Sequence, residues 1–125
     1  MLVDDTVATR PLSPMRPPQP GTAGVLAKLF RGLGDPTRLR ILLLLREREW
    51  SVTELVEELG VQQGRVSSHL ACLRWCGLVR TRRDKRRLLY GVADERVNEI
   101  VRLAEDFLDD NADNIDLCNT IDVSA

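Results

Sequence analysis

The sequence predicts a mainly α protein with one small β-hairpin, folded as a homodimeric winged helix-turn-helix. Two short helical patterns, residues 52–59 and 62–76, are separated by a tight turn at Gly60, as in a helix-turn-helix. Residues 78–92 then change to two β-prone runs around a polar tip at Asp84–Lys85, as in a hairpin. This order of elements predicts a helix-turn-helix followed by a wing.

The N-terminal part divides into an arm and two helices. Residues 1–22 contain five of the six prolines and show no apolar periodicity, so we expect a disordered or loosely packed arm. From Val25 the apolar residues recur at helical spacing, and Gly34 ends this first helix. Asp35 and Pro36 suit the N-cap and first position of a second helix, whose apolar run "ILLLL" we expect to be buried.

The helix-turn-helix has clear boundary signals. Ser51, followed three residues later by Glu54, makes a capping box at the start of its first helix, and Gly60 suits the end of that helix. Gly77 closes the second helix, "QQGRVSSHLACLRWC". The residues of this second helix that we expect to face the core are Val66, Leu70 and Leu73.

A last amphipathic helix, capped by Asp94, follows the hairpin. Its apolar residues recur at helical spacing and are Val97, Ile100, Val101, Ala104, Phe107 and Leu108. The first and last helices carry more apolar surface than so small a core needs, so we expect them to pair in a homodimer. The chain thus divides into the arm (1–22), a DNA-binding and dimerisation domain (23–110) and an acidic C-terminal tail (111–125) without a clear element.

Composition and charge exclude several classes of protein. No apolar run approaches the roughly 18 residues of a membrane span, and the N-terminus has acids at Asp4 and Asp5 and no apolar signal region, so we expect a cytoplasmic protein. The odd cysteine count argues against a disulfide framework. The net charge is −1, but residues 78–92 hold six basic residues against one acid, which predicts a surface that faces a polyanion.

The expected polyanion is operator DNA. The second helix of a helix-turn-helix enters the major groove with its N-terminal residues leading, where Gln can bind adenine and Ser several base edges or phosphates. The helix residues predicted to contact DNA are Gln62, Gln63, Arg65, Ser67 and Ser68. The wing residues predicted to contact the backbone or the minor groove are Arg82, Arg83, Lys85, Arg86 and Arg87. The alternative is an exposed helix and a solvated charged hairpin.

At these motifs the chain resembles the ArsR/SmtB family of metal-sensing repressors. The likeness is carried by "LGDPTRLRIL", by "TELVEELGVQQGRVSSHLACLRWCGLV" and by the wing ending "RLLYGV", and it covers roughly residues 23–108. It implies a dimeric winged-helix repressor that leaves DNA when metal binds. The arsenic-type Cys-x-Cys is absent from "TELVEEL", and the last helix has no histidine for a zinc-type site.

What remains is similar to the cadmium/lead-sensing branch, and mercury-resistance repressors of the same fold fit equally well. In that branch two cysteines stand four apart on the recognition helix, and a third comes from the tail of the other protomer. The matching residues here are Cys72, Cys76 and, in "NIDLCNT", Cys118. Whether Cys118 comes from the same or the partner protomer is left open by the sequence.

The residues themselves support a similar chemistry. Side chains four apart on a helix have Cβ atoms about 5–6 Å apart, so one ion can bridge Cys72 and Cys76 through thiolate bonds of roughly 2.3 Å or more. All-sulfur ligation selects soft ions, here Hg(II), Cd(II) or Pb(II), with As(III) as a further option. His69 is either an extra ligand or a buried hydrogen-bonding histidine.

Three other functions are alternatives to a metal-sensing repressor. A repressor of the same fold can respond to thiol oxidation instead of metal, and a constitutive DNA-binding module would have no effector. A thiol enzyme that uses Cys72 with His69 would need a substrate cleft, which a recognition helix does not offer. We therefore expect neither enzyme activity nor a small-molecule substrate.

Overall fold

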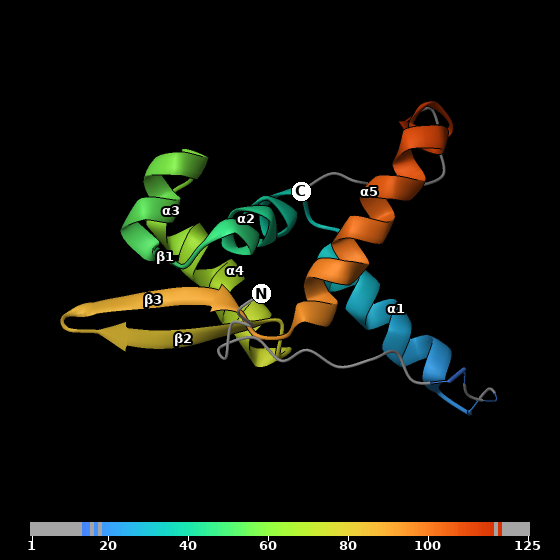
Figure 1. Cartoon of the computed structure of the whole chain (residues 1–125), viewed down its shortest axis with the longest axis horizontal. Coiled ribbons are helices and arrows are strands. Elements are labelled where there is room, and N and C mark those ends of the chain that lie inside the picture. The colour runs from blue at the N-terminus through green and yellow to red at the C-terminus, as the bar shows by residue number, and fades with distance from the viewer. Residues whose placement is uncertain (1–13, 16, 18, 117, 119–125) are drawn as a thin grey trace, which may run out of the picture.

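The computed structural model describes residues 14, 15, 17, 19–116 and 118. In chain order the elements are α1 (Thr22–Leu33), α2 (Pro36–Glu47), β1 (Trp50–Ser51), α3 (Val52–Leu59), α4 (Gln63–Trp75), β2 (Val79–Asp84), β3 (Arg87–Val92) and α5 (Glu95–Asp116). The β2–β3 hairpin extends to one side of the molecule, and α1 and α5 lie on the opposite side (Figure 1). The winged helix-turn-helix predicted from the sequence is confirmed, with α3 and α4 as the motif and the hairpin as the wing.

The predicted helix boundaries rest on local capping. The side chain of Asp35 accepts a hydrogen bond from the backbone N–H of Arg38 at 2.9 Å, which caps α2. Ser51 and Glu54 form the expected capping box, at 3.2 and 2.9 Å. Gly60 ends α3 at a φ of 66°, a left-handed conformation in which a side chain would be strained. Of these caps, Gly60 is the one that lets the chain turn from α3 into α4.

The core lies between α2, α3, α4 and the base of the sheet. Val66, Leu70 and Leu73 are fully or almost fully buried, as predicted, and α2 and α3 supply Ile41 and Leu55 to the same cluster. Burial of each such side chain contributes about 1.5–3 kcal/mol relative to exposure. This stripe holds α4 against the domain along its length and leaves its other faces in solvent.

The sheet is antiparallel with the order β1-β3-β2, and β1 is a two-residue strand that the sequence did not predict. The wing turns at Lys85 and Arg86, one residue later than expected, because Asp84 pairs with Arg87. Lys85 adopts a φ of 57°, which this two-residue turn requires.

The two helices away from the wing carry exposed apolar side chains. Among them are Phe30 of α1 and Phe107 of α5, and α5 continues to Asp116, so residues 111–116 of the expected tail are helical rather than irregular. The core of one chain therefore leaves some apolar side chains of α5 exposed, as predicted for a helix that pairs with a second copy. Within the described residues, no helix combines the length and the apolar character needed to cross a membrane.

Candidate functional site

The N-terminal half of α4 is presented to solvent. The five residues predicted to contact DNA are all exposed, and none of their side chains forms a hydrogen bond or ion pair with another described residue. Gln62 is the N-cap residue rather than part of the helix, and its side chain makes no capping hydrogen bond. Gln63 and Ser67 follow within the first turns, on faces away from the buried Val66. These side chains are therefore available for base or phosphate contacts.

The wing has two faces with different electrostatics. Successive strand residues point to opposite faces, and cross-strand partners share a face. The register places Arg82 opposite Leu89 and Arg80 opposite Gly91, whereas Arg83 lies opposite Leu88 and Thr81 opposite Tyr90. We call the face with Arg80, Arg82 and Arg87 the paired face, and the face with Thr81, Arg83, Leu88 and Tyr90 the groove face.

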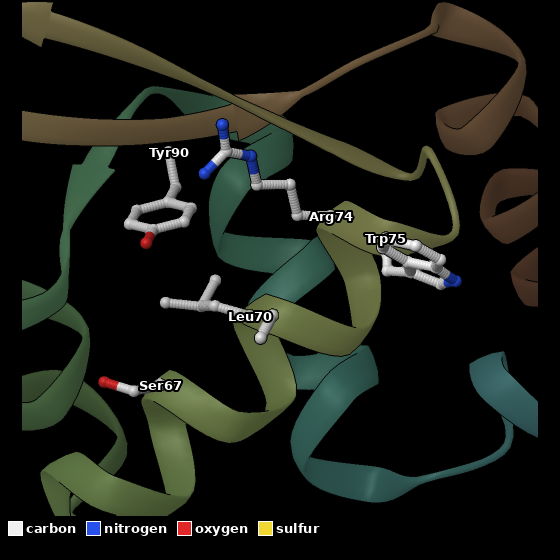
Figure 2. Close-up of a pocket in the computed structure, with 6 residues that line it drawn as sticks. Ser67, Leu70, Arg74, Trp75 and Tyr90 are labelled. Atoms are coloured by element: carbon white, nitrogen blue, oxygen red, sulfur yellow. The ribbon is translucent and has the colours of Figure 1, made fainter.

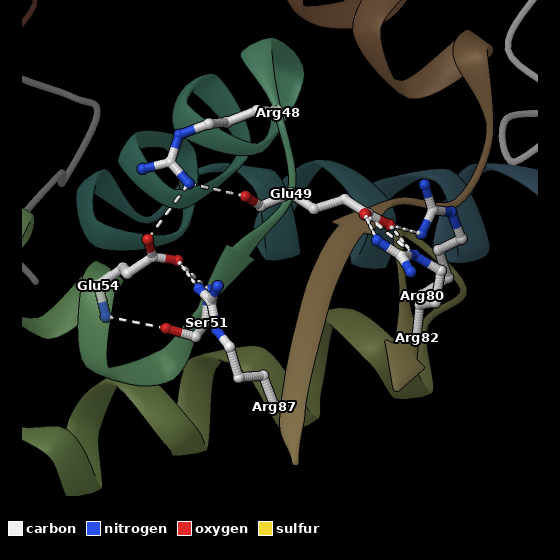
Figure 3. Close-up of polar contacts among 7 residues, drawn as sticks. All are labelled: Arg48, Glu49, Ser51, Glu54, Arg80, Arg82 and Arg87. Atoms are coloured by element: carbon white, nitrogen blue, oxygen red, sulfur yellow. Dashed lines mark hydrogen bonds and ion pairs between the residues drawn. The ribbon is translucent and has the colours of Figure 1, made fainter. Parts of the chain in front are cut away.

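The arginines of the paired face are bound to glutamates (Figure 3). Glu49 accepts hydrogen bonds from Arg80 and Arg82, each with a shortest contact of 2.6 Å, and Arg87 contacts Glu54 at 2.9 Å. The hydrogen bonds from Arg82, together with Arg80, hold the pKa of the Glu49 carboxyl below its ordinary value despite partial burial. Glu49 is thus ionised at neutral pH and neutralises charge on this face.

The remaining basic residues of the wing are differently placed. Arg83, Lys85 and Arg86 are exposed, and within the described part of the chain none of them forms an ion pair. Of the five predicted wing contacts, these three can meet a phosphate directly. Arg82 and Arg87 are exposed as well, but Glu49 and Glu54 partly neutralise their charges.

The two thiols of α4 are brought together at its C-terminal end. Cys72 and Cys76 are both exposed and stand one helical turn apart at the end of α4. Partial burial raises the pKa of the Cys76 thiol, and the neighbouring Cys72 raises it further. Cys76 caps the helix and donates its N–H to the Cys72 carbonyl. The structure therefore places two soft donors side by side, as the sequence predicted.

The third predicted ligand lies elsewhere in the single chain. Cys118 is half-buried beyond the end of α5, where its N–H donates to the Ile115 carbonyl at 3.2 Å. Among the residues that the structure describes, no three His, Cys, Asp or Glu side chains are grouped so as to hold a metal ion. One chain thus presents the Cys72–Cys76 pair without a third ligand beside it.

His69 faces α2 rather than solvent. The Arg38 guanidinium lies 3.3 Å from His69 Nδ1, and Asp35 lies 3.8 Å from its Nε2. Since arginine only donates, Nδ1 is the acceptor. Burial, the largest cause, and the nearby Arg38 and Arg65 lower the pKa of the imidazole although Asp35 opposes them, so His69 is neutral at pH 7. This environment fits the predicted hydrogen-bonding histidine.

Arg38 also reaches the end of α1. Its side chain donates to the Gly32 carbonyl at 2.6 Å, beside its contact with His69. The same guanidinium is near enough to Cys76 to act on its thiol electrostatically. The C-terminal half of α4 is therefore tied through one arginine to the helix that bears the exposed Phe30.

One feature of the site was not predicted from the sequence. A groove of about 430 Å³ lies between α4 and β3 and is lined by Ser67, Leu70, Ala71, Arg74, Trp75 and Tyr90. Figure 2 shows Arg74 and Tyr90 close together over Leu70, while the Trp75 ring points away. The signal was present, because Arg74 is two helical turns after Ser67 and shares its face.

Comparisons with known proteins agree with this architecture. Residues 35–81 match the family model for bacterial regulatory proteins of the arsR family. The chain is 46% identical over 95 residues to the "Probable mercury resistance operon repressor" of Streptomyces lividans, and the match covers 76% of each chain.

Solved structures agree as well. The crystal structure of Rv0081 from Mycobacterium tuberculosis has a TM-score of 0.71 and 33% identity, over 78% of this chain and 97% of that one. The homodimeric winged helix-turn-helix DNA-binding domain of Mb0332 from Mycobacterium bovis has a TM-score of 0.64 and 30% identity, over 76% and 91%. The winged fold, the exposed helix α4 and these matches lead to the same conclusion. The chain belongs to the ArsR family of DNA-binding transcriptional regulators and is not an enzyme.

Proposed function

We propose that this regulator is a metal-responsive repressor that binds operator DNA as an apo homodimer and is released by a soft ion. Cys72, Cys76 and Cys118 of the partner subunit would hold Hg(II), Cd(II) or Pb(II), and release would derepress a metal resistance or efflux operon. The observation that carries the proposal is the exposed Cys72–Cys76 pair on the helix whose other half faces solvent for DNA. The mercury-repressor relative supports the choice of effector class.

The proposed DNA surface combines the exposed half of α4 with the wing tip. Gln62, Gln63, Ser67 and Ser68 would read or flank the bases, and Arg65 would meet phosphate. In the wing we assign the first contacts to Arg83, Lys85 and Arg86, because they are exposed without an ion pair among the described residues. Arg82 and Arg87 can follow once phosphate displaces Glu49 and Glu54.

The donor set suits a soft ion. Two adjacent thiols at the end of a helix supply sulfur ligands, which hard cations do not prefer. A site of three thiolates lacks the fourth ligand of a closed tetrahedral zinc site. A metal bound there displaces the thiol protons. Cys118 follows α5, which we expect to lie in the dimer interface, so we assign the third ligand to the partner's tail.

Release of DNA requires that the two halves of α4 be coupled. Closure of the site by the partner's tail would bring its acidic residues, which include Asp113 and Asp116, toward the recognition helix. Negative charge near the DNA surface and a shifted α4 both disfavour the DNA-bound state. Thermodynamic reciprocity then requires that DNA weaken metal binding by the same factor.

A repressor that senses thiol oxidation is the second candidate. Redox-sensing thiols have a lowered pKa and are thiolates at neutral pH. At Cys76, burial and the neighbouring Cys72 raise the pKa, so neither oxidation nor metal binding starts from a preformed thiolate there. A disulfide between residues one helical turn apart would strain α4. This strain favours metal over oxidation.

The test begins with an operator duplex obtained by in vitro selection with the wild-type protein. Fluorescence anisotropy follows release of this duplex during titration with Hg(II), Cd(II), Pb(II) and Zn(II), while thiolate absorption bands report ligand number. We expect release by the soft ions, with one fewer thiolate in Cys118→Ser. Release by an oxidant in the absence of metal, with none by the soft ions, would instead establish the redox candidate.

A further inference from the structure

The groove between α4 and the wing is built from an apolar floor and polar walls. The buried Leu70 forms the floor, while Ser67 and Arg74 project from α4 and Tyr90 from the groove face of β3 (Figure 2). Its volume is about 430 Å³, and the exposed Ser67 and Arg74 open it to solvent. The recognition helix and the wing, which would enter adjacent grooves of DNA, are its two walls.

The polar groups of this groove have no partners in the described part of the chain. The Arg74 guanidinium forms no ion pair there, and the hydroxyls of Ser67 and Tyr90 form no side-chain hydrogen bond. The paired face of the same hairpin differs, because its arginines contact Glu49 and Glu54. Uncompensated donors therefore gather on the side of the wing that faces α4, where Arg83 continues them toward the tip.

The geometry of duplex DNA says what passes through such a groove. A recognition helix lies in the major groove, and the wing reaches the adjacent minor groove. The two grooves are separated by one sugar-phosphate strand, so that strand must cross between helix and wing. Phosphate oxygens accept hydrogen bonds from guanidinium and hydroxyl groups, and these are the groups found here.

We propose that the α4–wing groove is the seat of the DNA strand that separates the helix-bound major groove from the wing-bound minor groove. Arg74 donates to a phosphate of this strand, with the hydroxyls of Tyr90 and Ser67 as further donors. The site rests on the proposed function, since it needs DNA on α4 and the wing. It extends the DNA contacts into the half of α4 that carries the thiols.

The test compares salt dependence in Arg74→Gln, Tyr90→Phe and wild type. Each lost phosphate contact lowers the slope of log K against log salt by about 0.9. The substitution removes one contact from each half-site of the dimer, so we expect Arg74→Gln to lose about twice this amount of slope. At about tenfold for each contact, it should bind the selected operator about a hundredfold more weakly. Tyr90→Phe should lose about fivefold, with a smaller change in slope. Arg74→Lys should recover the slope, because it keeps the charge.

Arg40→Gln is the matched control. Arg40 is also exposed and forms no ion pair among the described residues, but it lies on α2, beside Glu47 and Glu58. We expect it to leave affinity and slope unchanged. A fall equal to that of Arg74→Gln would show a general charge effect and overturn the groove assignment.

A methylphosphonate scan of the operator locates the contact. In each half-site, one phosphate between the helix-bound and wing-bound grooves should be sensitive to neutralisation. Its neutralisation should lower the operator affinity of wild type and leave the operator affinity of Arg74→Gln unchanged. If wild type binds DNA and Arg74→Gln binds it with unchanged affinity and slope, the groove assignment is wrong and the proposed function stands. If wild type selects no duplex, both are wrong.

Discussion

The two halves of α4 have the same buried stripe and opposite surface chemistry. In the N-terminal half, Gln63 and Ser67 offer neutral hydrogen-bonding groups to solvent. In the C-terminal half, Cys72 and Cys76 offer two soft sulfur donors, and His69 is bound to Arg38. The difference fits the proposal that one helix carries a DNA-reading end and an effector-binding end.

The shared stripe explains how one end can affect the other. Val66, Leu70 and Leu73 are buried over two helical turns, so a shift of α4 against the core would displace both of its ends. A ligand that shifts the two thiols would therefore also shift the N-terminal half of α4. The predictions below separate its two ends, from the largest expected effect to the smallest.

The largest effect is expected at the thiol end. The double substitution Cys72→Ser and Cys76→Ser should abolish release of DNA by soft metal, a loss of roughly 5–150-fold in coupling. Operator affinity without metal should stay near that of wild type, because both side chains are exposed. Anisotropy titrations with and without Hg(II) give both values. Release at wild-type metal concentrations would place the effector site elsewhere.

An intermediate effect is expected at the reading end. Gln63→Ala and Ser67→Ala should each weaken operator binding, by about 1–3 kcal/mol where the residue makes a good base contact. Metal binding by Cys72 and Cys76 should not change, since both substitutions lie more than one helical turn away from either cysteine. Thiolate absorption measures the metal, and anisotropy the operator. A variant that loses metal affinity as well would contradict the division of the helix.

The smallest effect concerns the junction at His69. The pKa of His69 is lowered from an ordinary value of 6.5, so the folded state resists protonation and the unfolded state does not. Stability should therefore fall as the pH drops below about 6.5, where the unfolded chain takes up the proton. Urea unfolding at neutral and mildly acidic pH should show a smaller fall in His69→Gln. An equal loss of stability in wild type and His69→Gln would show that other groups cause the pH dependence.

Much of the fold could be predicted because its signals are local. Ser51 with Glu54, and Asp35 with Pro36, mark helix starts within four residues, and both starts were confirmed. The buried stripe of α4 follows from a period of 3.6 residues. The extension of α5 to Asp116 was missed because residues 111–116 are polar and show no apolar period.

The electrostatics of the wing could not be predicted in the same way. Glu49 and Arg82 are 33 residues apart, and only the pairing of β3 with both β1 and β2 brings them together. A count of basic residues therefore predicted the same contact with DNA for Arg82 and Arg87 as for Arg83. The α4–wing groove depends on the same pairing, since it places Tyr90 beside Arg74. The two adjacent thiols needed only helical spacing, and the sequence predicted them.

The most direct test of the central claim is the affinity of the protein for Hg(II) with and without its operator. We expect DNA to weaken Hg(II) binding by the same factor by which Hg(II) weakens DNA binding, as one coupling free energy requires. Competition titrations with a thiol chelator measure the first factor, and anisotropy measures the second. Equal Hg(II) affinity for the free and the DNA-bound dimer would show that the thiols bind metal without sensing it, and would contradict the account.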